Sequence, residues 1–363
     1  MNTEQKPWIE EIDRFYSHCS AGKTDQAYNR IFPGTYMYLV NDEKRSVRFL
    51  ADRFDDATVY RRGVAFALRC LASVPSLLRF VPGFDRCSVS VVPERGFDVA
   101  ILGSRTKLLS WEHETAITLS NGYPEFVRKE IEVRRKLPSS VQVPKTIDAN
   151  GDFPYLIEQL IDGTPLGTPR DDWPFYRQAF LQLRRAYEQF PSESVPIDHV
   201  LSEVEEGLRQ QGLLEDEMLR RAVRTIEQLE LPESLSRGFA HGDVFGGNLL
   251  RDGDRVLILD WAESSFDRFQ FGDFVHPLLK QFGITGDADL LVEVFADRDF
   301  GAEILGAYAN DLGESVWEST KSFPGCVLLY PLTVLADERY SQTYSETTYY
   351  GAIAELLNSE HDR

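Results

Sequence analysis

Short apolar runs separated by polar turns fill the region from residue 86 to residue 162. The runs lie at 88–92, 97–102, 107–111, 115–119 and 155–161. Because each has the length and composition of a β-strand, they predict a small sheet of antiparallel strands. A helix is expected at 125–137, where Pro124 suits the first turn and Pro138 ends the pattern.

From residue 171 onward, apolar residues recur at helical spacing. The pattern predicts helices at 175–190, 199–211, 213–229, 288–296, 302–312, 327–340 and 349–357. A hairpin interrupts them, because an apolar run that stops at Ala240 is followed by short apolar runs at 249–250 and 256–259. Asp252 and Gly253 supply the tight turn between the last two runs.

The first 85 residues have a different pattern. They predict a short helix at 8–19, a strand at 35–40 and a helical pattern at 56–80 that Pro75 breaks. We interpret them as an extension that packs on the sheet rather than as a binding module. The predicted domains are an extension at 1–85, a sheet domain at 86–162 and a helical domain at 163–363.

Composition and charge narrow the class of protein. The chain has 363 residues, of which 42% are apolar and 12% aromatic, so a substantial core can form. Its net charge of −19 argues against nucleic acid or an anionic membrane as a partner, because both attract basic surfaces. No apolar run reaches transmembrane length, and the amino-terminus has no apolar signal core. Since the four cysteines lie far apart, we expect a cytoplasmic protein with reduced thiols.

Candidate chemistry gathers at the open end of the predicted hairpin. Asp243 and Asn248 lie in the loop after the first strand, and Asp260 ends the strand that returns to them. Two carboxylates and an amide are hard oxygen ligands of the kind that Mg²⁺ prefers. An Asp that orients a hydroxyl, with an Asn and a second Asp on the metal, is the set of groups that phosphoryl transfer requires.

The same residues form a motif with a known counterpart. The pattern H-G-D-x-x-x-x-N at 241–248, followed by an apolar run and D-W at 260–261, resembles the aminoglycoside phosphotransferase and choline kinase superfamily. The resemblance implies that Asp243 is the catalytic base and that Asn248 and Asp260 bind Mg²⁺.

The resemblance also implies a fold and substrates. The fold is α+β and protein-kinase-like, with a small antiparallel-sheet N-lobe at 86–162 and a larger, mostly helical C-lobe at 163–363. His241 is expected to brace the catalytic loop. The phosphoryl donor is ATP or GTP, and the acceptor is a hydroxyl group of a small molecule of the amino sugar, sugar or amino alcohol class.

The nucleotide side departs from the family pattern at one position. Gly103 and Ser104 lie where the family has a glycine-containing loop, whose N–H groups cradle phosphates. The third strand in the family presents a basic residue to the phosphates, but its distance to the following helix makes that residue Thr118 here. Arg105 or Lys107 is expected to supply the charge instead, and in a second register Lys107 is itself the strand lysine.

Further nucleotide contacts are expected from a helix and a strand. Glu130, on the predicted helix, matches the family's glutamate that pairs with the strand lysine. The run at 155–161 resembles the linker between the lobes, whose backbone contacts the adenine. We therefore expect main-chain groups of Glu158, Gln159 and Leu160 to contact the nucleotide base.

Three acidic residues follow the motif. Asp273 resembles the residue that opens the family's next helix and ties it to the catalytic loop, and it also suits a helix N-cap. Glu263 and Asp267 are candidate acceptor contacts, with solvated surface charge as the alternative. His276 is interpreted as a packed helix residue rather than a ligand.

Two other functions stay open. The absence of a strand lysine at Thr118 suggests a non-catalytic nucleotide-binding or regulatory module that kept its metal ligands. A protein kinase agrees less well with the sequence, because Gly242 stands where protein kinases usually carry Arg, and no D-F-G or A-P-E segment follows.

Overall fold

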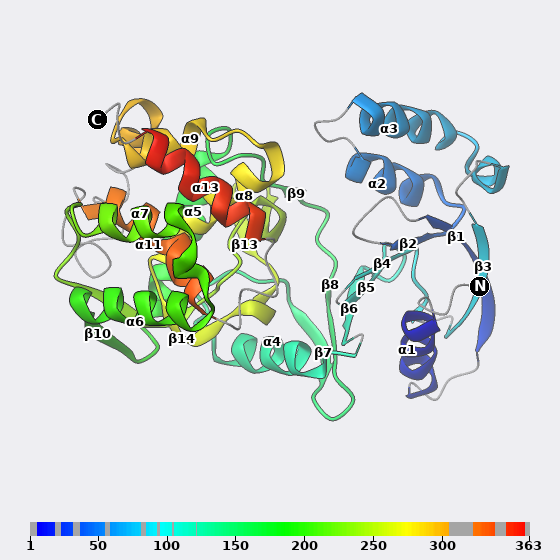
Figure 1. Ribbon diagram of the computed structural model, residues 1–363. Coiled ribbons are helices and arrows are strands. Elements are labelled where there is room, and N and C mark those ends of the chain that lie inside the picture. Colours follow the sequence, from blue (N-terminus) through cyan, green and yellow to red (C-terminus); the bar gives the residue numbers. More distant parts are fainter. Residues whose placement is uncertain are drawn as a thin grey trace. The chain divides into compact units, whose positions relative to one another are not determined.

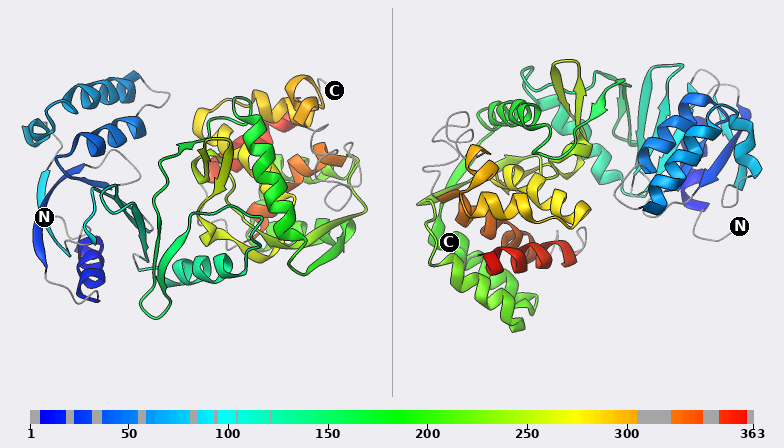
Figure 2. Two further views of the ribbon diagram at one scale, coloured as in Figure 1. Left: turned by 180° about the vertical axis from the view of Figure 1, so that it is seen from behind. Right: turned by 90° about the horizontal axis from the view of Figure 1, so that it is seen from above.

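The chain folds into two compact units. The computed structural model describes residues 6–18, 23–31, 37–54, 59–80, 85–92, 95–103, 105–120, 122–304, 322–337 and 346–359. The first unit contains Met1–Arg135 and Pro144–Asp162, and the second contains Lys136–Val143 and Gly163–Arg363. Figure 1 and Figure 2 show the elements of each unit, coloured along the sequence.

The first unit is built on one sheet of eight antiparallel strands, in the spatial order β3-β1-β2-β4-β5-β6-β8-β7 (Figure 1). In chain order the strands are β1 (Thr24–Ile31), β2 (Met37–Val40), β3 (Asp85–Val91), β4 (Val99–Leu102), β5 (Thr106–Ser110), β6 (Thr115–Leu119), β7 (Thr146–Asn150) and β8 (Tyr155–Gln159). Hydrogen-bonded strand pairs link the whole row, so the sheet forms one continuous layer.

The segment interpreted as an extension supplies the strands at one end of this sheet. β2 pairs antiparallel with β4, with Val40 opposite Val99, and β1 lies between β2 and β3. The helices of this segment are α1 (Lys6–His18), α2 (Lys44–Phe54) and α3 (Val59–Leu71), followed by the 3-10 helix η2 (Pro75–Phe80). Residues before β4 therefore belong to the same hydrogen-bonded sheet as the strands after it.

Helices cover both faces of the sheet. On one face, Ile12, Phe15 and Tyr16 of α1 pack in a cluster with Leu108 and Ile117 of the central strands. All five side chains are almost completely buried. Burying such side chains is the main favourable contribution to folding.

On the opposite face, α2 and α3 cover the same central strands. Val47 and Leu50 of α2 and Leu68 of α3 form a buried cluster with Leu109 and Ala116. Leu109 and Ala116 lie directly opposite each other in the pairing of β5 with β6. They therefore point to the same face, as side chains of directly paired residues do.

A third helix, α4 (Pro124–Lys136), packs on this second face. Val127 and Ile131 of α4 contact Leu156, which lies opposite Thr118 in the pairing of β8 with β6. Because side chains alternate along a strand, Thr118 shares its face with Ala116. The second face is thus covered by α2, α3 and α4, whereas α1 covers the first.

The second unit is mostly helical. Its helices include α5 (Trp173–Tyr187), α6 (Ile197–Gln210), α7 (Glu217–Ile226), α8 (Gly272–Thr285), α9 (Asp289–Phe295), α11 (Phe323–Ala336) and α13 (Glu346–Ser359). α11 is almost entirely buried and packs against α6, α9 and α13. Two small sheets, β10-β11-β14 and β13-β12-β9, are formed by β9 (Thr164–Pro165), β10 (Ser192–Pro196), β11 (Ser234–Ala240), β12 (Leu249–Asp252), β13 (Arg255–Ile258) and β14 (Ser265–Phe269).

The predicted α+β architecture is confirmed, while several elements differ from expectation. The helix predicted at 213–229 is a short 3-10 helix, η4 (Leu213–Glu215), followed by α7. Asp216 separates them because its side chain caps α7 by accepting hydrogen bonds from the N–H groups of Met218 and Leu219. Of the helix predicted at 302–312, the part from residue 305 lies outside the described residues.

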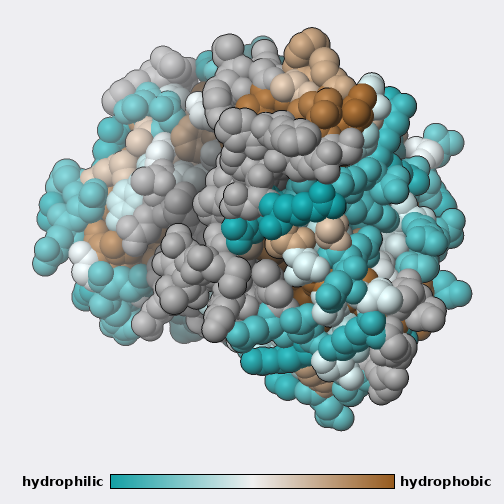
Figure 3. Space-filling view, turned by 90° about the vertical axis from the view of Figure 1, so that its right-hand side faces the viewer, coloured by the Kyte–Doolittle hydropathy of each residue, from teal (hydrophilic) through white to brown (hydrophobic). Residues whose placement is uncertain are grey.

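One face of the molecule is mainly polar where its residues are described. In the view of Figure 3, hydrophilic residues cover most of the coloured surface, and hydrophobic residues form small separate patches. This distribution agrees with the net charge of −19. Within the described ranges, the helices are too short or too polar to cross a membrane.

Candidate active site

The hairpin of the second unit brings the predicted site residues to one end. β11 leads into the loop at 241–248, and β12 and β13 form an antiparallel pair. The N–H of Leu259 donates to the carbonyl oxygen of Asn248 at 2.8 Å, so Asp260 follows directly on the residue paired with Asn248. Asp260 has φ 60° and ψ 69°, a left-handed conformation that non-glycine residues seldom adopt. Such backbone strain is typical of functional sites.

A buried carboxylate on α8 holds the loop. Asp273 accepts hydrogen bonds from the main-chain N–H groups of His241 and Gly242, each at 2.7 Å. The hydroxyl of Tyr187 donates to the same carboxylate at 2.6 Å. Burial, and then the charge of Asp273, raises the pKa of Tyr187 well above its ordinary value, so the hydroxyl keeps its proton. Since α8 has its N-cap at Phe271, the Asp273 carboxylate serves the loop rather than the helix end.

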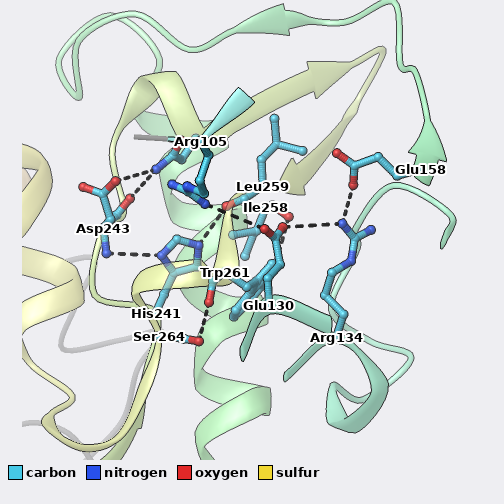
Figure 4. A network of polar contacts seen from close by, with 11 residues as sticks. Arg105, Glu130, Arg134, Glu158, His241, Asp243, Ile258, Leu259, Trp261 and Ser264 are labelled. Atoms are coloured by element: carbon cyan, nitrogen blue, oxygen red, sulfur yellow. Dashed lines mark hydrogen bonds and ion pairs between the residues drawn. The ribbon is translucent and has the colours of Figure 1, made fainter. Parts of the chain in front are cut away.

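His241 braces the same loop from within. The ring is fully buried, its Nδ1 accepts from the N–H of Asp243 at 3.3 Å, and its Nε2 lies 2.9 Å from the carbonyl oxygen of Leu259. Because Nδ1 is an acceptor, Nε2 carries the proton and donates to Leu259. The ring packs on Trp261 with the centroids 4.6 Å apart. Figure 4 shows His241 lying between Asp243 and Leu259, so one side chain ties the loop to the returning strand.

Gly242 is required by both conformation and space. Its φ is +83°, and a Cβ atom there would lie 1.7 Å from Nη1 of Arg268 and 2.8 Å from the carbonyl oxygen of Glu263. A larger residue would therefore need a strained backbone and would displace Arg268. The arginine that protein kinases usually carry at this position does not fit the loop.

Asp243 is held through both carboxylate oxygens. Oδ1 lies 3.1 Å from Nε2 of His276 and 3.6 Å from Nζ of Lys280, while Oδ2 accepts from Nδ2 of Asn248 at 2.9 Å. Burial by itself would raise the pKa of Asp243, but the hydrogen bond from His276 and the Lys280 ammonium outweigh it and lower the pKa below its ordinary value. Asp243 is therefore an oriented, ionised carboxylate that can accept a proton.

The residues at the hairpin end fit a magnesium ion. Nδ2 of Asn248 donates two hydrogen bonds to Asp243. The amide oxygen of Asn248 is therefore the atom that could bind a cation. Together with Asp260, it forms a set of hard oxygen donors. Across the described ranges, no cluster of three or more His, Cys, Asp or Glu residues can hold a metal. A site with one carboxylate and one amide is what Mg²⁺ uses when phosphates and water complete its shell.

Two residues at this site were not predicted. His276 was interpreted as a packed helix residue, and Lys280 was not singled out, yet both contact Asp243. They share α8 with Asp273, at spacings of three and four residues, which place all three side chains on one face of the helix. In the sequence, the sign of these contacts was a row of polar residues on one face of an otherwise apolar helix.

In the first unit, a buried ionic cluster surrounds Glu130. Arg134, one turn along α4, lies 3.7 Å from Glu130 and also forms an ion pair with Glu158 of β8. Figure 4 shows Arg134 between the two carboxylates. Arg105 lies 3.7 Å from the other oxygen of Glu130. Two guanidinium groups thus compensate two buried carboxylates, the condition under which buried charges are tolerated.

This cluster changes the expected partner of Glu130. Thr118 is buried on β6 and lies opposite Lys107 of β5. The basic residue that pairs with Glu130 from the loop before β5 is Arg105. Arg134 was not predicted, although its spacing of four residues from Glu130 places both on one face of α4.

The main chain expected to contact a nucleotide base already has partners in the first unit. The N–H of Gln159 donates to the carbonyl oxygen of Lys145 and that of Leu160 to Glu114, each at 2.8 Å. The side chain of Leu160 packs against the cluster covered by α2 and α3. Base contacts at these residues would therefore have to use carbonyl groups rather than those N–H groups.

The remaining predicted residues lie as follows. Gly103 starts a tight turn, in which its N–H donates to the carbonyl oxygen of Arg105 at 3.2 Å, and Ser104 lies outside the described residues. Glu263 ends the 3-10 helix η6 (Trp261–Glu263), and its carbonyl oxygen approaches Gly242. Asp267 is exposed and lies 3.9 Å from Arg237, which agrees with a surface ion pair.

Comparison with known proteins gives one family match. The model of a family described as the phosphotransferase enzyme family matches residues 105–321, which is more than half of the chain. The match includes Arg105, Glu130, the loop at 241–248 and Asp260. None of the curated proteins matches the chain.

Solved structures share low sequence identity with the chain. The GDP complex of aminoglycoside 2′-phosphotransferase-IIIa has 14% identity and a TM-score of 0.47, over 71% of this chain and 90% of that one. A macrolide 2′-phosphotransferase from Brachybacterium faecium has 16% identity and a TM-score of 0.43, over 73% and 90%. A choline/ethanolamine kinase family protein from Mesorhizobium loti has 14% identity and a TM-score of 0.36, over 70% and 84%.

Proposed function

The chain belongs to the phosphotransferase enzyme family and is a small-molecule phosphotransferase, and we propose that it transfers the γ-phosphoryl group of ATP or GTP to a hydroxyl group of its acceptor with the help of Mg²⁺. The observation that carries this proposal is the state of Asp243. It is ionised, fixed through both oxygens, and set beside an amide and a carboxylate that suit magnesium. A phosphotransferase needs these groups because its chemistry is mainly positioning and charge neutralisation.

In the proposed reaction, Asp243 orients the acceptor hydroxyl and takes its proton. The acceptor oxygen forms a bond to the γ-phosphorus, the bond from that phosphorus to the bridging oxygen breaks, and the nucleoside diphosphate leaves with the electron pair. Asn248 and Asp260 would hold Mg²⁺, which neutralises charge on the phosphate oxygens when it is bound. Asp273 and His241 hold the loop in place. The Asp243 carboxylate is therefore already positioned before the reaction begins.

The first unit is proposed to bind the nucleotide. The residues assigned to it are Gly103, Ser104, Arg105, Lys107, Glu130 and the main chain of Glu158, Gln159 and Leu160. The ion pair of Arg105 with Glu130 supports Arg105 as the phosphate-binding cation in place of the lysine that Thr118 replaces. An Arg can take this role because its guanidinium binds phosphate through two parallel hydrogen bonds.

One observation favours a second function. Thr118 is buried on the strand where the family presents its basic residue, and Glu130, the expected partner of that residue, is already paired with Arg134. A non-catalytic nucleotide-binding module would need the metal ligands but not this contact. It is the alternative that an activity measurement must exclude.

Calorimetry of ATP and GTP binding, with and without Mg²⁺, is the first test. The wild type is compared with Asp260→Ala, and phosphoryl transfer is then measured on amino sugars, sugars and amino alcohols with Asp243→Asn as the background. Mg²⁺-dependent binding that Asp260→Ala abolishes, together with transfer above that background, supports the enzyme. Mg²⁺-dependent binding without transfer to any acceptor supports the non-catalytic module. A folded wild type that binds neither nucleotide contradicts both.

The acceptor class and the location of the enzyme belong to the same proposal. The acceptor is expected to be an amino sugar, a sugar or an amino alcohol, because each carries a hydroxyl that Asp243 can orient. The location is proposed to be the cytoplasm, because the four cysteines lie far apart in the sequence.

A further inference from the structure

A chain of polar contacts extends from Asp243 into the core of the second unit. Nε2 of His276 lies 3.1 Å from Oδ1 of Asp243, and Nδ1 of the same ring lies 3.1 Å from the hydroxyl oxygen of Tyr330. His276 lies on α8 and Tyr330 on α11, so the contacts join the loop to two helices. The exposed fraction of His276 is 1%, so its ring is enclosed by the second unit.

The hydrogen-bond chemistry settles which ring nitrogen carries the proton. An ionised carboxylate only accepts hydrogen bonds, so Nε2 of His276 must be the donor to Asp243. Burial lowers the pKa of His276 despite the adjacent carboxylate, which leaves the ring neutral near pH 7. A neutral ring protonated at Nε2 has an unprotonated Nδ1, which accepts a hydrogen bond from the Tyr330 hydroxyl.

The position of Tyr330 is itself fixed by packing. A Cβ atom on Gly272 would lie 2.5 Å from the Tyr330 ring, so the missing side chain of Gly272 makes room for the ring. Phe271 meets the same ring edge-on, with the centroids 5.9 Å apart. The other charged or titratable groups that face His276 are Lys280 and Asp273.

We propose that His276 and Tyr330 are positioning residues for the catalytic base: Tyr330 holds the His276 ring through its Nδ1 atom, and His276 fixes the rotation of the Asp243 carboxylate. This proposal deepens the proposed function and rests on it. With Oδ1 held by His276 and Oδ2 by Asn248, the carboxylate cannot turn about its last side-chain bond without losing a hydrogen bond. A neutral donor achieves this without the full positive charge that would weaken the base.

Kinetics of matched variants test the proposal. His276→Gln keeps an N–H group within reach of Asp243, whereas His276→Leu removes it. We expect kcat to fall by about 100-fold in His276→Leu and by far less in His276→Gln, with the KM for the nucleotide unchanged in both. We expect Tyr330→Phe to lower kcat by about fivefold, the effect of one ordinary hydrogen bond.

A buried tyrosine elsewhere serves as the control. The hydroxyl of Tyr28 donates to the carbonyl oxygen of Phe97 at 2.7 Å in the first unit, so Tyr28→Phe loses a comparable hydrogen bond without touching the chain of contacts to Asp243. Equal losses of kcat in Tyr330→Phe and Tyr28→Phe would mean that both act only through packing. Equal losses in His276→Gln and His276→Leu would likewise overturn the proposal.

Nitrogen-15 NMR of the histidine rings gives a test that needs no activity. The chain has six histidines, and His276 is assigned by the signal that His276→Gln removes. We expect a neutral ring protonated at Nε2 in the wild type at pH 7, and the same tautomer in Tyr330→Phe with the Nδ1 signal shifted by the loss of its hydrogen bond. A His276 protonated at Nδ1, or charged at pH 7, overturns the proposal even if no acceptor is found. The expected tautomer in a protein that transfers no phosphate would instead refute the proposed function alone.

Discussion

The main-chain N–H of Gly242 donates to Oδ1 of Asp273 at 2.7 Å, across 31 positions of the sequence. The neighbouring N–H of His241 donates to the other oxygen of the same carboxylate. One buried side chain on α8 therefore anchors the loop that carries Asp243. Loss of this anchor should affect both the stability of the second unit and the position of the base.

Asp273→Ala removes a buried carboxylate that accepts three hydrogen bonds. We expect the free energy of unfolding to fall by roughly 3 kcal/mol, because two main-chain N–H groups and the Tyr187 hydroxyl lose their acceptor in the core. Urea unfolding measures the change, and phosphoryl transfer should be lost as well. Asp267→Ala is the control, since Asp267 is exposed, and it should change stability by less than about 0.5 kcal/mol. Similar unfolding midpoints for the two variants would contradict the anchoring role.

Gly242→Ala should be more destabilising than Gly253→Ala. Both glycines have positive φ, so each substitution carries the cost of a left-handed conformation, about 1 kcal/mol. Only at Gly242 does the new Cβ also meet Arg268, whereas the space around Gly253 is open. We expect a further loss of about 1–3 kcal/mol from this overlap, measured by thermal unfolding. Arg268→Ala in the Gly242→Ala background should recover part of the loss, and no recovery would show that Arg268 is not the obstacle.

Asp260→Asn separates the charge of Asp260 from its backbone conformation. Asparagine tolerates the left-handed region, so the hairpin end should keep its shape while the proposed metal ligand loses its charge. We expect nucleotide affinity with Mg²⁺ to fall by about 100-fold, and affinity without Mg²⁺ to stay the same. Titration calorimetry under both conditions provides the measurement. A variant whose affinity falls equally with and without Mg²⁺ would argue against a metal at Asp260.

The buried ring of His276 should make stability depend on pH. Burial lowers its folded pKa below the ordinary value of 6.5, so the unfolded chain binds an extra proton as the pH falls below that value. The stability that the neutral ring contributes is complete above pH 6.5 and is lost as the pH falls toward the folded pKa. His276→Gln has no such proton, so its unfolding free energy should decline less than that of the wild type between pH 7.5 and 5.5. Parallel declines in urea unfolding would show that the folded ring titrates normally.

The sequence allowed the centre of the candidate site to be predicted because its residues are local. Asp243, Asn248 and Asp260 lie within one hairpin, and the turn at Gly253 and the two apolar runs define its strands. Contacts between residues far apart in the sequence were harder to predict. His276 approaches Asp243 only because α8 packs beside the loop, and the polar residues on one face of that helix do not show which loop they will meet.

Prediction of the strands in the first unit was also incomplete. β4, β5 and β6 were predicted because apolar residues dominate them. β1 (Thr24–Ile31) and β7 (Thr146–Asn150) were not, since polar residues such as Asp25 and Asn150 mask their strand character. They are strands because hydrogen bonding with neighbours in the sheet outweighs a weak intrinsic preference.

The pairing of β2 with β4 decides where the protein can be shortened. The family match begins at residue 105, which suggests that the preceding hundred or so residues are dispensable. A chain that began at residue 99 would instead expose the main-chain groups of β4 to which β2 is bonded, and would uncover Leu109 and Ala116 beneath α2 and α3. Open strand edges of this kind recruit further copies of the same chain. Recombinant fragments that begin at β4 should therefore aggregate, so samples for the experiments above should keep β1 and β2 and the helices α2 and α3.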